Sequence, residues 1–328
     1  MSRISFPFKP TFSGHETFPL RQLWLRKAYE QVVDHLKFRQ SDLLDGEPAA
    51  DDPVLLATKD VFNGGDALER FGVGKNMVAA IKHWGLACDI IRENRKKDGY
   101  FIGEIGEFLF GDYAHDPFLE HEASLWLIHW LLASRGSKSA TWYVLFNFIH
   151  PQTFQMRDVA NLIQDYAAES QAVRSKTTIQ RDIEVCLKCY ASVPARNTTE
   201  DSAEPLLTDL NLILPAGSNL YQFNRGPQHS LSVQVFVFAL MDFWERWENQ
   251  IGSTQSTLSF NTIAYEFGSP GRVFKLSEDA LADRLAALSD DTRGYLAWTD
   301  SAGLRQVSRL GKEPLSKKKI TILAQAYD

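Results

Sequence analysis

Apolar residues recur at helical spacing through most of the chain, and pairs of short apolar runs interrupt this pattern at two places. Apolar positions three or four residues apart indicate helices that bury one face. The spacing predicts helices over residues 18–38, 118–134, 154–170, 176–191, 230–249, 259–269 and 277–290. The paired runs predict β-hairpins over 86–105 and 294–310. The expected fold is therefore mainly α with small β-hairpin wings.

The stretch "FGVGKNMVAAIKHWG", residues 71–85, places glycines before a helix, as phosphate-binding loops do. A phosphate loop requires G-x-x-x-x-G-K-[ST], but Asn76 follows Lys75 and Glu69 occupies the first glycine position. A dinucleotide-binding fingerprint would need its third glycine at Met77. The stretch instead favours a helix-turn-helix, whose second helix can enter the major groove of DNA. An ordinary helical hairpin of the core has the same periodicity and stays an alternative.

The residues of this stretch divide into a buried and an outer face. We expect the buried face to contain Ala67, Leu68, Phe71, Met77, Val78, Ile81 and Trp84. The outer face would present Lys75, Asn76, Ala79, Lys82 and His83. Lysine is suited to phosphate contacts and asparagine to reading adenine.

A polar segment that ends in Asp98-Gly99 joins the two apolar runs that follow, and this pattern predicts a hairpin wing. Residues 71–97 carry six basic side chains against two acidic ones, a local net charge of +4. The sequence therefore predicts a winged helix-turn-helix that binds DNA. Its candidate DNA-binding residues are Lys75, Asn76, Lys82, Arg92, Arg95, Lys96 and Lys97.

The order of elements beyond residue 206 also resembles a winged helix. Residues 305–319 carry six basic side chains against one acidic residue, and Arg305 and Arg309 are candidate DNA contacts. A solvated basic tail is the alternative. The expected organisation is a winged-helix domain at 1–115, a helical middle domain at 116–190, a linker at 191–205 and a winged-helix-like domain at 206–328.

Composition limits what the whole protein can be. The 328 residues are 44% hydrophobic, enough for a large core, and the net charge of −6 requires that any DNA-binding surface be a segregated basic patch. Three cysteines make a disulfide framework improbable, and the cytoplasm is the expected compartment. The longest apolar segments are shorter than the roughly 20 residues needed to cross a bilayer, so no membrane association is expected.

Catalytic candidates are few. His15 and Glu16 lie together in the loop "FSGHETFPL", where an imidazole and a carboxylate could move a proton or, through Glu16, bind a metal. Helix capping around Thr17 is the structural alternative. Cys186 and Cys189 have C-x-x-C spacing, but a closed zinc site normally requires four ligands, so buried structural thiols are favoured.

Five blocks together resemble a known family. In chain order they are "FSGHETFPLRQLWLRKAYE", "GVGKNMVAAIKHWGLA", "DPFLEHEASLWLIHW", "KTTIQRDIEVCLKCY" and "YQFNRGPQHSLSVQVFVFALMDFW". They are similar to the SspB family of bacterial DNA phosphorothioation (Ssp) systems, long grouped as a domain of unknown function. No catalytic motif of that family could be assigned residue by residue.

The resemblance implies a strand-nicking component of an antiphage DNA modification system. Its implied partners are double-stranded DNA, an SspA-like cysteine desulfurase, an SspC-like ATPase and an SspD-like sulfur-transfer protein; a homodimer is also considered. An endonuclease would use Mg²⁺ or another divalent metal. The alternative is a non-catalytic DNA-binding adaptor or a regulator of the modification operon, because the sequence contains no recognisable nuclease core.

Overall fold

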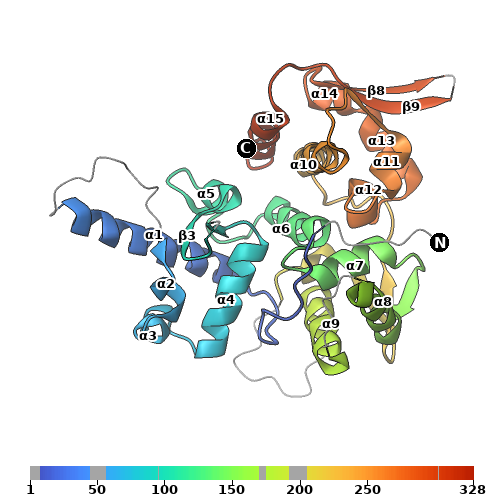
Figure 1. The fold of residues 1–328 in the computed structure, drawn as a ribbon. Coiled ribbons are helices and arrows are strands. Elements are labelled where there is room, and N and C mark those ends of the chain that lie inside the picture. The colour runs from blue at the N-terminus through green and yellow to red at the C-terminus, as the bar shows by residue number, and fades with distance from the viewer. Residues whose placement is uncertain (1–7, 45–56, 95, 170–174, 192–204, 302) are drawn as a thin grey trace. The chain divides into compact units, whose positions relative to one another are not determined.

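The computed structural model describes residues 8–44, 57–94, 96–169, 175–191, 205–301 and 303–328, and these are mainly helical with three small antiparallel sheets. The expectation of a mainly α chain with β-hairpins is confirmed. The chain divides into two compact units (Figure 1). The small unit comprises Ser13–Glu120 with Pro194–Leu206, and the large unit comprises Met1–Phe12, His121–Val193 and Leu207–Asp328. The segments 116–190 and 206–328, expected as separate domains, both contribute mainly to the large unit.

The small unit alternates helices with short strands. In order these are α1 (Gln22–Leu44), β1 (Ala57–Thr58), α2 (Asp60–Asn63), α3 (Ala67–Phe71), α4 (Lys75–Ala87), β2 (Ile91–Glu93), β3 (Gly99–Ile102) and α5 (Glu104–Phe110). The strands form one antiparallel sheet in the order β1-β3-β2. Ile91 pairs with Ile102, so the hairpin predicted in this region is confirmed.

Close packing of α1 on α4 forms the core of the small unit. Val78, Ile81 and Trp84 on α4 are almost fully buried, as their spacing predicted. A Cβ atom at Gly85 would lie 2.9 Å from the Cβ of Ala28 on α1, so only glycine allows this approach. Leu68, which the sequence placed in the buried face, is instead 48% exposed.

The large unit begins with a buried helical layer. Its elements are α6 (Glu122–Arg135), α7 (Ala140–Phe148), β4 (Thr153–Gln155), α8 (Met156–Glu169), α9 (Lys176–Tyr190), a 3₁₀ turn (Thr208–Leu210), β5 (Ile213–Gly217) and β6 (Leu220–Phe223). It continues with α10 (Val233–Ile251), β7 (Thr257–Ser259), α11 (Phe260–Tyr265), α12 (Pro270–Val273), α13 (Glu278–Ala286), α14 (Leu288–Asp291), β8 (Leu296–Ser301), β9 (Leu304–Arg309) and α15 (Leu315–Ala324). Residues 123–134 of α6 are all buried, so this helix is apolar on every side.

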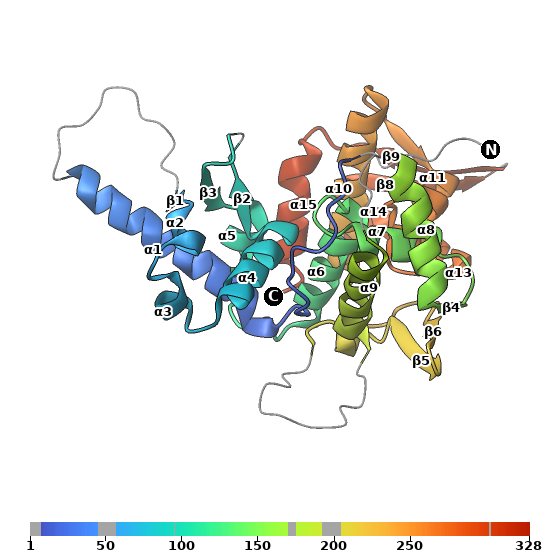
Figure 2. The ribbon, with the colours of Figure 1, turned by 60° about the horizontal axis from the view of Figure 1, so that its bottom comes forward.

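The same strand order occurs three times. Each time, a short strand after a helix pairs with the second strand of a later hairpin, giving β1-β3-β2, β4-β6-β5 and β7-β9-β8 (Figure 2). The hairpin predicted near 294–310 is confirmed as β8 and β9. The middle region, expected to be mostly helical, also contributes the short strand β4, which pairs with β6 from beyond the predicted linker. That pairing joins residues far apart in sequence, and helical periodicity does not indicate it.

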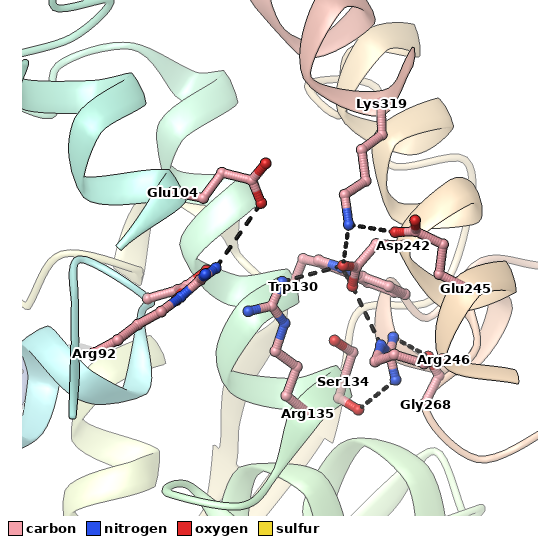
Figure 3. Close-up of polar contacts among 11 residues, drawn as sticks. Arg92, Glu104, Trp130, Ser134, Arg135, Asp242, Glu245, Arg246, Gly268 and Lys319 are labelled. Atoms are coloured by element: carbon pink, nitrogen blue, oxygen red, sulfur yellow. Dashed lines mark hydrogen bonds and ion pairs between the residues drawn. The ribbon is translucent and has the colours of Figure 1, made fainter. Parts of the chain in front are cut away.

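A buried ionic network around Asp242 joins α6, α10 and α15 (Figure 3). Its carboxylate, 3% exposed, accepts hydrogen bonds from Trp130 (3.0 Å), Arg135 (3.1 Å), Arg246 (3.3 Å) and Lys319 (3.1 Å). Burial alone would raise the pKa of Asp242, but the three cations more than offset this and hold that pKa well below its usual range.

The position of Lys319 corrects one sequence-based expectation. The sequence counted it in a basic stretch available to DNA, but its side chain is buried where α15 packs on α10. Its ammonium also contacts Glu245 at 2.6 Å. This charge is therefore used inside the fold, because a buried ammonium requires carboxylate partners.

Candidate nucleic-acid interface

The turn between α3 and α4 depends on glycine. Gly72 has φ 63°, in the left-handed region, and its N–H bonds to the carbonyls of Leu68 and Glu69. Gly74 then adopts an extended conformation and precedes the first residue of α4. The two short helices are thus joined by a tight turn, since glycine populates positive φ without the cost that a side chain adds.

The outer face of α4 is cationic and free of acidic residues. Lys75 and Asn76 are exposed in its first turn, and Lys82 is half-buried two turns later. Residues seven apart lie on nearly the same side of a helix, so Lys75 and Lys82 share one face. Ala79 lies between them and is partly exposed. The arrangement presents two cations and one amide with only a small side chain between them.

The hairpin after α4 adds further cations. Lys96 and Lys97 are exposed at its turn, which the Asn94 side chain closes by accepting from the Asp98 N–H at 3.0 Å. Lys97 itself has φ 56°. The side chain of Arg95, another candidate, lies outside the described residues.

Arg92 is held differently from the other candidates. Its guanidinium contacts both carboxylate oxygens of Asp89, at 2.5 and 2.6 Å, and lies 3.9 Å from Glu104 (Figure 3). Its charge is therefore largely compensated within the small unit, and we expect it to contribute less to a phosphate contact than Lys96 or Lys97.

The loop that contains His15 and Glu16 packs against α4. The His15 ring is 2% exposed and stacks on Trp84 with ring centroids 5.8 Å apart, and the His83 ring lies 5.7 Å away. A Cβ atom at Gly14 would come within 2.3 Å of the His83 ring, so the loop lies directly on this histidine. His83 is consequently buried, whereas its spacing had placed it on the outer face.

Glu16 has a different environment from its neighbour. It is exposed, while His15 is buried, so the structure does not bring the two side chains into one enclosed cavity. Ser13, Glu16 and Thr17 all have positive φ, at 57°, 48° and 71°. Such a conformation is strained for a β-branched residue like Thr17, and strained backbone concentrates at functional sites.

The carboxy-terminal candidates are compensated by nearby acids. Arg305 lies 3.3 Å from Asp300 and over the Phe260 ring at 3.9 Å, and Arg309 lies 3.6 Å from Glu248. The helix of this repeat that corresponds to α4 is α13, which exposes Glu278, Asp279 and Asp283. This acidic face would repel a DNA backbone, so it offers no support for DNA binding through this repeat.

Metal-binding groups are sparse in the part of the chain that the structure describes. Within it, no group of three or more His, Cys, Asp or Glu side chains is placed to hold a metal ion. A metal centre formed by protein side chains alone therefore does not fit these residues. Mg²⁺, however, is often held by one or two carboxylates together with substrate phosphates and water.

One buried histidine and one pair of cysteines have structural roles. His129 is fully buried; its ring nitrogens lie 2.8 Å from the Tyr190 hydroxyl and 2.9 Å from the Val273 carbonyl. Burial lowers the pKa of His129 to about 3, so it is neutral at physiological pH. Cys186 and Cys189 are both buried. Burial raises the pKa of Cys186, which suits a structural thiol.

No helix among the described residues is both long and apolar enough to cross a membrane. No curated protein matches the sequence. Two solved structures do resemble the chain, both at 26% sequence identity and both covering 97% of this chain and 88% of the other. One is a crystal structure of SspB, with a TM-score of 0.79, and the other is a crystal structure of magnesium ion-bound SspB, with a TM-score of 0.78.

A family model described as a protein of unknown function (DUF4007) matches residues 12–327. The match extends over nearly all of both units, and it agrees with the five sequence blocks quoted above. The resemblance to SspB is confirmed, and the chain belongs to the DUF4007 family.

Proposed function

We propose that the chain is a DNA-binding component of a DNA phosphorothioation system and that its small unit is a winged helix that grips double-stranded DNA. The observation that carries this proposal is the exposed, acid-free cationic face of α4, placed after a tight turn and before a hairpin. The order of one strand, three helices (α2, α3 and α4) and a hairpin, with the sheet order β1-β3-β2, supports a winged helix.

Each element of the small unit has a role in this proposal. Helix α4 would lie in the major groove, with its amino-terminal residues at the base edges, as recognition helices do. Lys75 and Lys82 would meet phosphates, and the hairpin lysines would contact the neighbouring backbone. The overall charge of −6 makes this local patch the main source of attraction.

Asn76 is the candidate for reading sequence, because an asparagine amide can pair with both the N6 and N7 positions of adenine. Replacing Asn76 with Ala is expected to reduce discrimination between preferred and scrambled DNA by about 1–3 kcal/mol, with little change in affinity for scrambled DNA. Competition binding with the two duplexes measures this. A matched loss on both duplexes would show that Asn76 contacts only the backbone.

Strand nicking is the finer part of the proposal and rests on the resemblance to SspB. An SspB-like protein would open one strand so that sulfur can replace a non-bridging phosphate oxygen. The expected partners are an SspA-like cysteine desulfurase, an SspC-like ATPase and an SspD-like sulfur-transfer protein. A relative crystallised with magnesium supports Mg²⁺ as the ion to test first.

The loop at 13–18 is our candidate for the chemistry because it combines strained backbone with contact to α4. Replacing Glu16 with Gln is expected to abolish conversion of supercoiled plasmid to open circle in Mg²⁺, while the melting temperature stays within about 1 °C because the side chain is exposed. Glu69→Gln, another exposed carboxylate of the small unit, is the matched control.

If the Glu16 variant nicks DNA at the wild-type rate, Glu16 has no catalytic role and the catalytic residues lie outside this loop. His15 is a poorer probe, because its ring is buried and truncation would leave a cavity. If purified wild-type protein binds DNA but never nicks it, with or without Mg²⁺, the protein is the non-catalytic adaptor.

A further inference from the structure

Three basic side chains of the large unit converge around His150, just beyond the end of α7. The guanidinium of Arg272, on α12, donates to the His150 ring at 3.2 Å and to the Asn147 carbonyl at 2.7 Å. Arg225, just after β6, donates to the His150 carbonyl at 3.0 Å. Lys275 is buried behind them with its Nζ 2.7 Å from the Phe146 carbonyl, and burial together with Arg225 and Arg272 holds the pKa of this amine well below its usual range.

The backbone fixes this cluster. The Gly226 N–H bonds to the Lys275 carbonyl at 3.2 Å, and Gly226 also forms an isolated bridge with Leu276. The segment that carries Arg225 is therefore attached to the segment that follows Arg272. Two guanidinium groups that would otherwise repel each other are held beside one imidazole.

Among the described residues, no carboxylate forms an ion pair within 4.0 Å of Arg225, Arg272 or Lys275. Burial lowers the pKa of the Arg272 guanidinium. Glu266 raises this pKa and Arg225 lowers it, and burial prevails. The Asp242 network in the same unit shows the opposite arrangement, with carboxylates inserted among its cations. Within the described part of the chain, the two guanidinium groups of the cluster therefore lack a carboxylate in direct contact, and Glu266 compensates only Arg272 from a distance.

The tautomer of His150 follows from its partner. A guanidinium has only N–H donors, so the ring nitrogen that Arg272 contacts must be the acceptor, and the proton of the neutral ring lies on Nε2. Burial and the three neighbouring basic side chains lower the pKa of His150, which keeps the ring neutral. The cluster thus offers guanidinium donors and one imidazole N–H.

We propose that Arg225, Arg272 and His150 form a second phosphate-binding site, which holds a backbone phosphate of DNA. Arginine forks match the oxygens of a phosphate group, and both Arg225 and His150 are exposed at the surface rather than enclosed in a cavity. An open site suits a phosphate that belongs to a large polyanion. That this phosphate belongs to DNA rests on the proposed function, whereas the existence of a phosphate-binding site rests only on the contacts around His150.

Arg225→Gln tests the site, because this exposed side chain makes only one of the hydrogen bonds above. The slope of log affinity for duplex DNA against log salt should fall by about 0.9, the value for one phosphate contact. Arg157→Gln, which also removes an exposed positive charge from the same unit, should leave the slope unchanged. Equal slopes for wild type and both variants would overturn the DNA assignment.

Inorganic phosphate supplies an independent readout. In NMR titrations, the His150 resonance, identified by its loss in His150→Gln, should report a pKa about one unit higher in phosphate than in chloride of equal ionic strength. Arg225→Gln should abolish this difference. A phosphate response with an unchanged DNA slope would assign the site to a free oxyanion and contradict our choice of DNA.

Absence of both effects would overturn the site entirely, even if the small unit binds DNA as proposed. Conversely, wild-type protein that fails to bind DNA would overturn the proposed function, and the phosphate titration would then decide the site alone.

Discussion

Replacing Asp242 with Asn is expected to lower the free energy of unfolding by about 3–5 kcal/mol, the usual cost of removing one partner from a buried ion pair. The variant would leave Arg135, Arg246 and Lys319 with one negative charge fewer in a buried setting. Urea unfolding followed by tryptophan fluorescence measures the change. Asp283→Asn, at an exposed position on α13, is the matched control and should change stability by less than about 0.5 kcal/mol.

The network around Asp242 also predicts how the free energy of unfolding changes with pH. Because the pKa of Asp242 in the folded protein lies well below its usual range, its stabilising contribution is complete above the unfolded-state pKa of about 3.9. That contribution is lost progressively as the pH falls from the unfolded-state value towards the lower, folded-state value. Wild-type stability should therefore fall more steeply than that of Asp242→Asn below about pH 4. Parallel curves, or a loss below about 1 kcal/mol at pH 7, would contradict this account of the network.

The second large effect concerns DNA affinity. Replacing Lys75, Lys82, Lys96 and Lys97 with Gln is expected to reduce the salt slope by up to about 3.6, or roughly 0.9 for each phosphate contact. At about 0.1 M salt this corresponds to a loss of affinity on the order of 10³-fold. Fluorescence anisotropy with a labelled duplex at several salt concentrations measures both quantities.

A variant with the same change in net charge provides the control. Four exposed lysines of the large unit can be replaced with Gln: Lys176, Lys188, Lys312 and Lys317. Both variants change the net charge from −6 to −10, since four positive charges are removed. If the two variants lose affinity equally, attraction depends on overall charge and not on the face of α4.

Local features of the small unit could be predicted from sequence. The spacing of Val78, Ile81 and Trp84 predicted the buried side of α4, and the apolar runs around Asp98-Gly99 predicted the hairpin. These features depend on residues close together in the chain, where periodicity and turn chemistry are informative.

Features that depend on distant partners could not be predicted. The spacing of His83 suggested exposure, but the loop at Gly14 covers it, and helical periodicity contains no information about that loop. Lys319 looked like part of a basic tail because its partner Asp242 lies 77 positions away. The cluster around His150 joins residues 75 and 122 positions apart, and in sequence each is an isolated polar residue.

The central claim is that α4 lies against DNA, and site-specific photocrosslinking tests it most directly. Benzoylphenylalanine would replace Ala79, the fifth residue of α4, or Ala282, the fifth residue of the acidic helix α13; both positions are partly exposed. We expect irradiation with a labelled duplex to give a salt-sensitive protein–DNA adduct from position 79 and none from position 282. Adducts from position 282 with none from position 79 would contradict the claim.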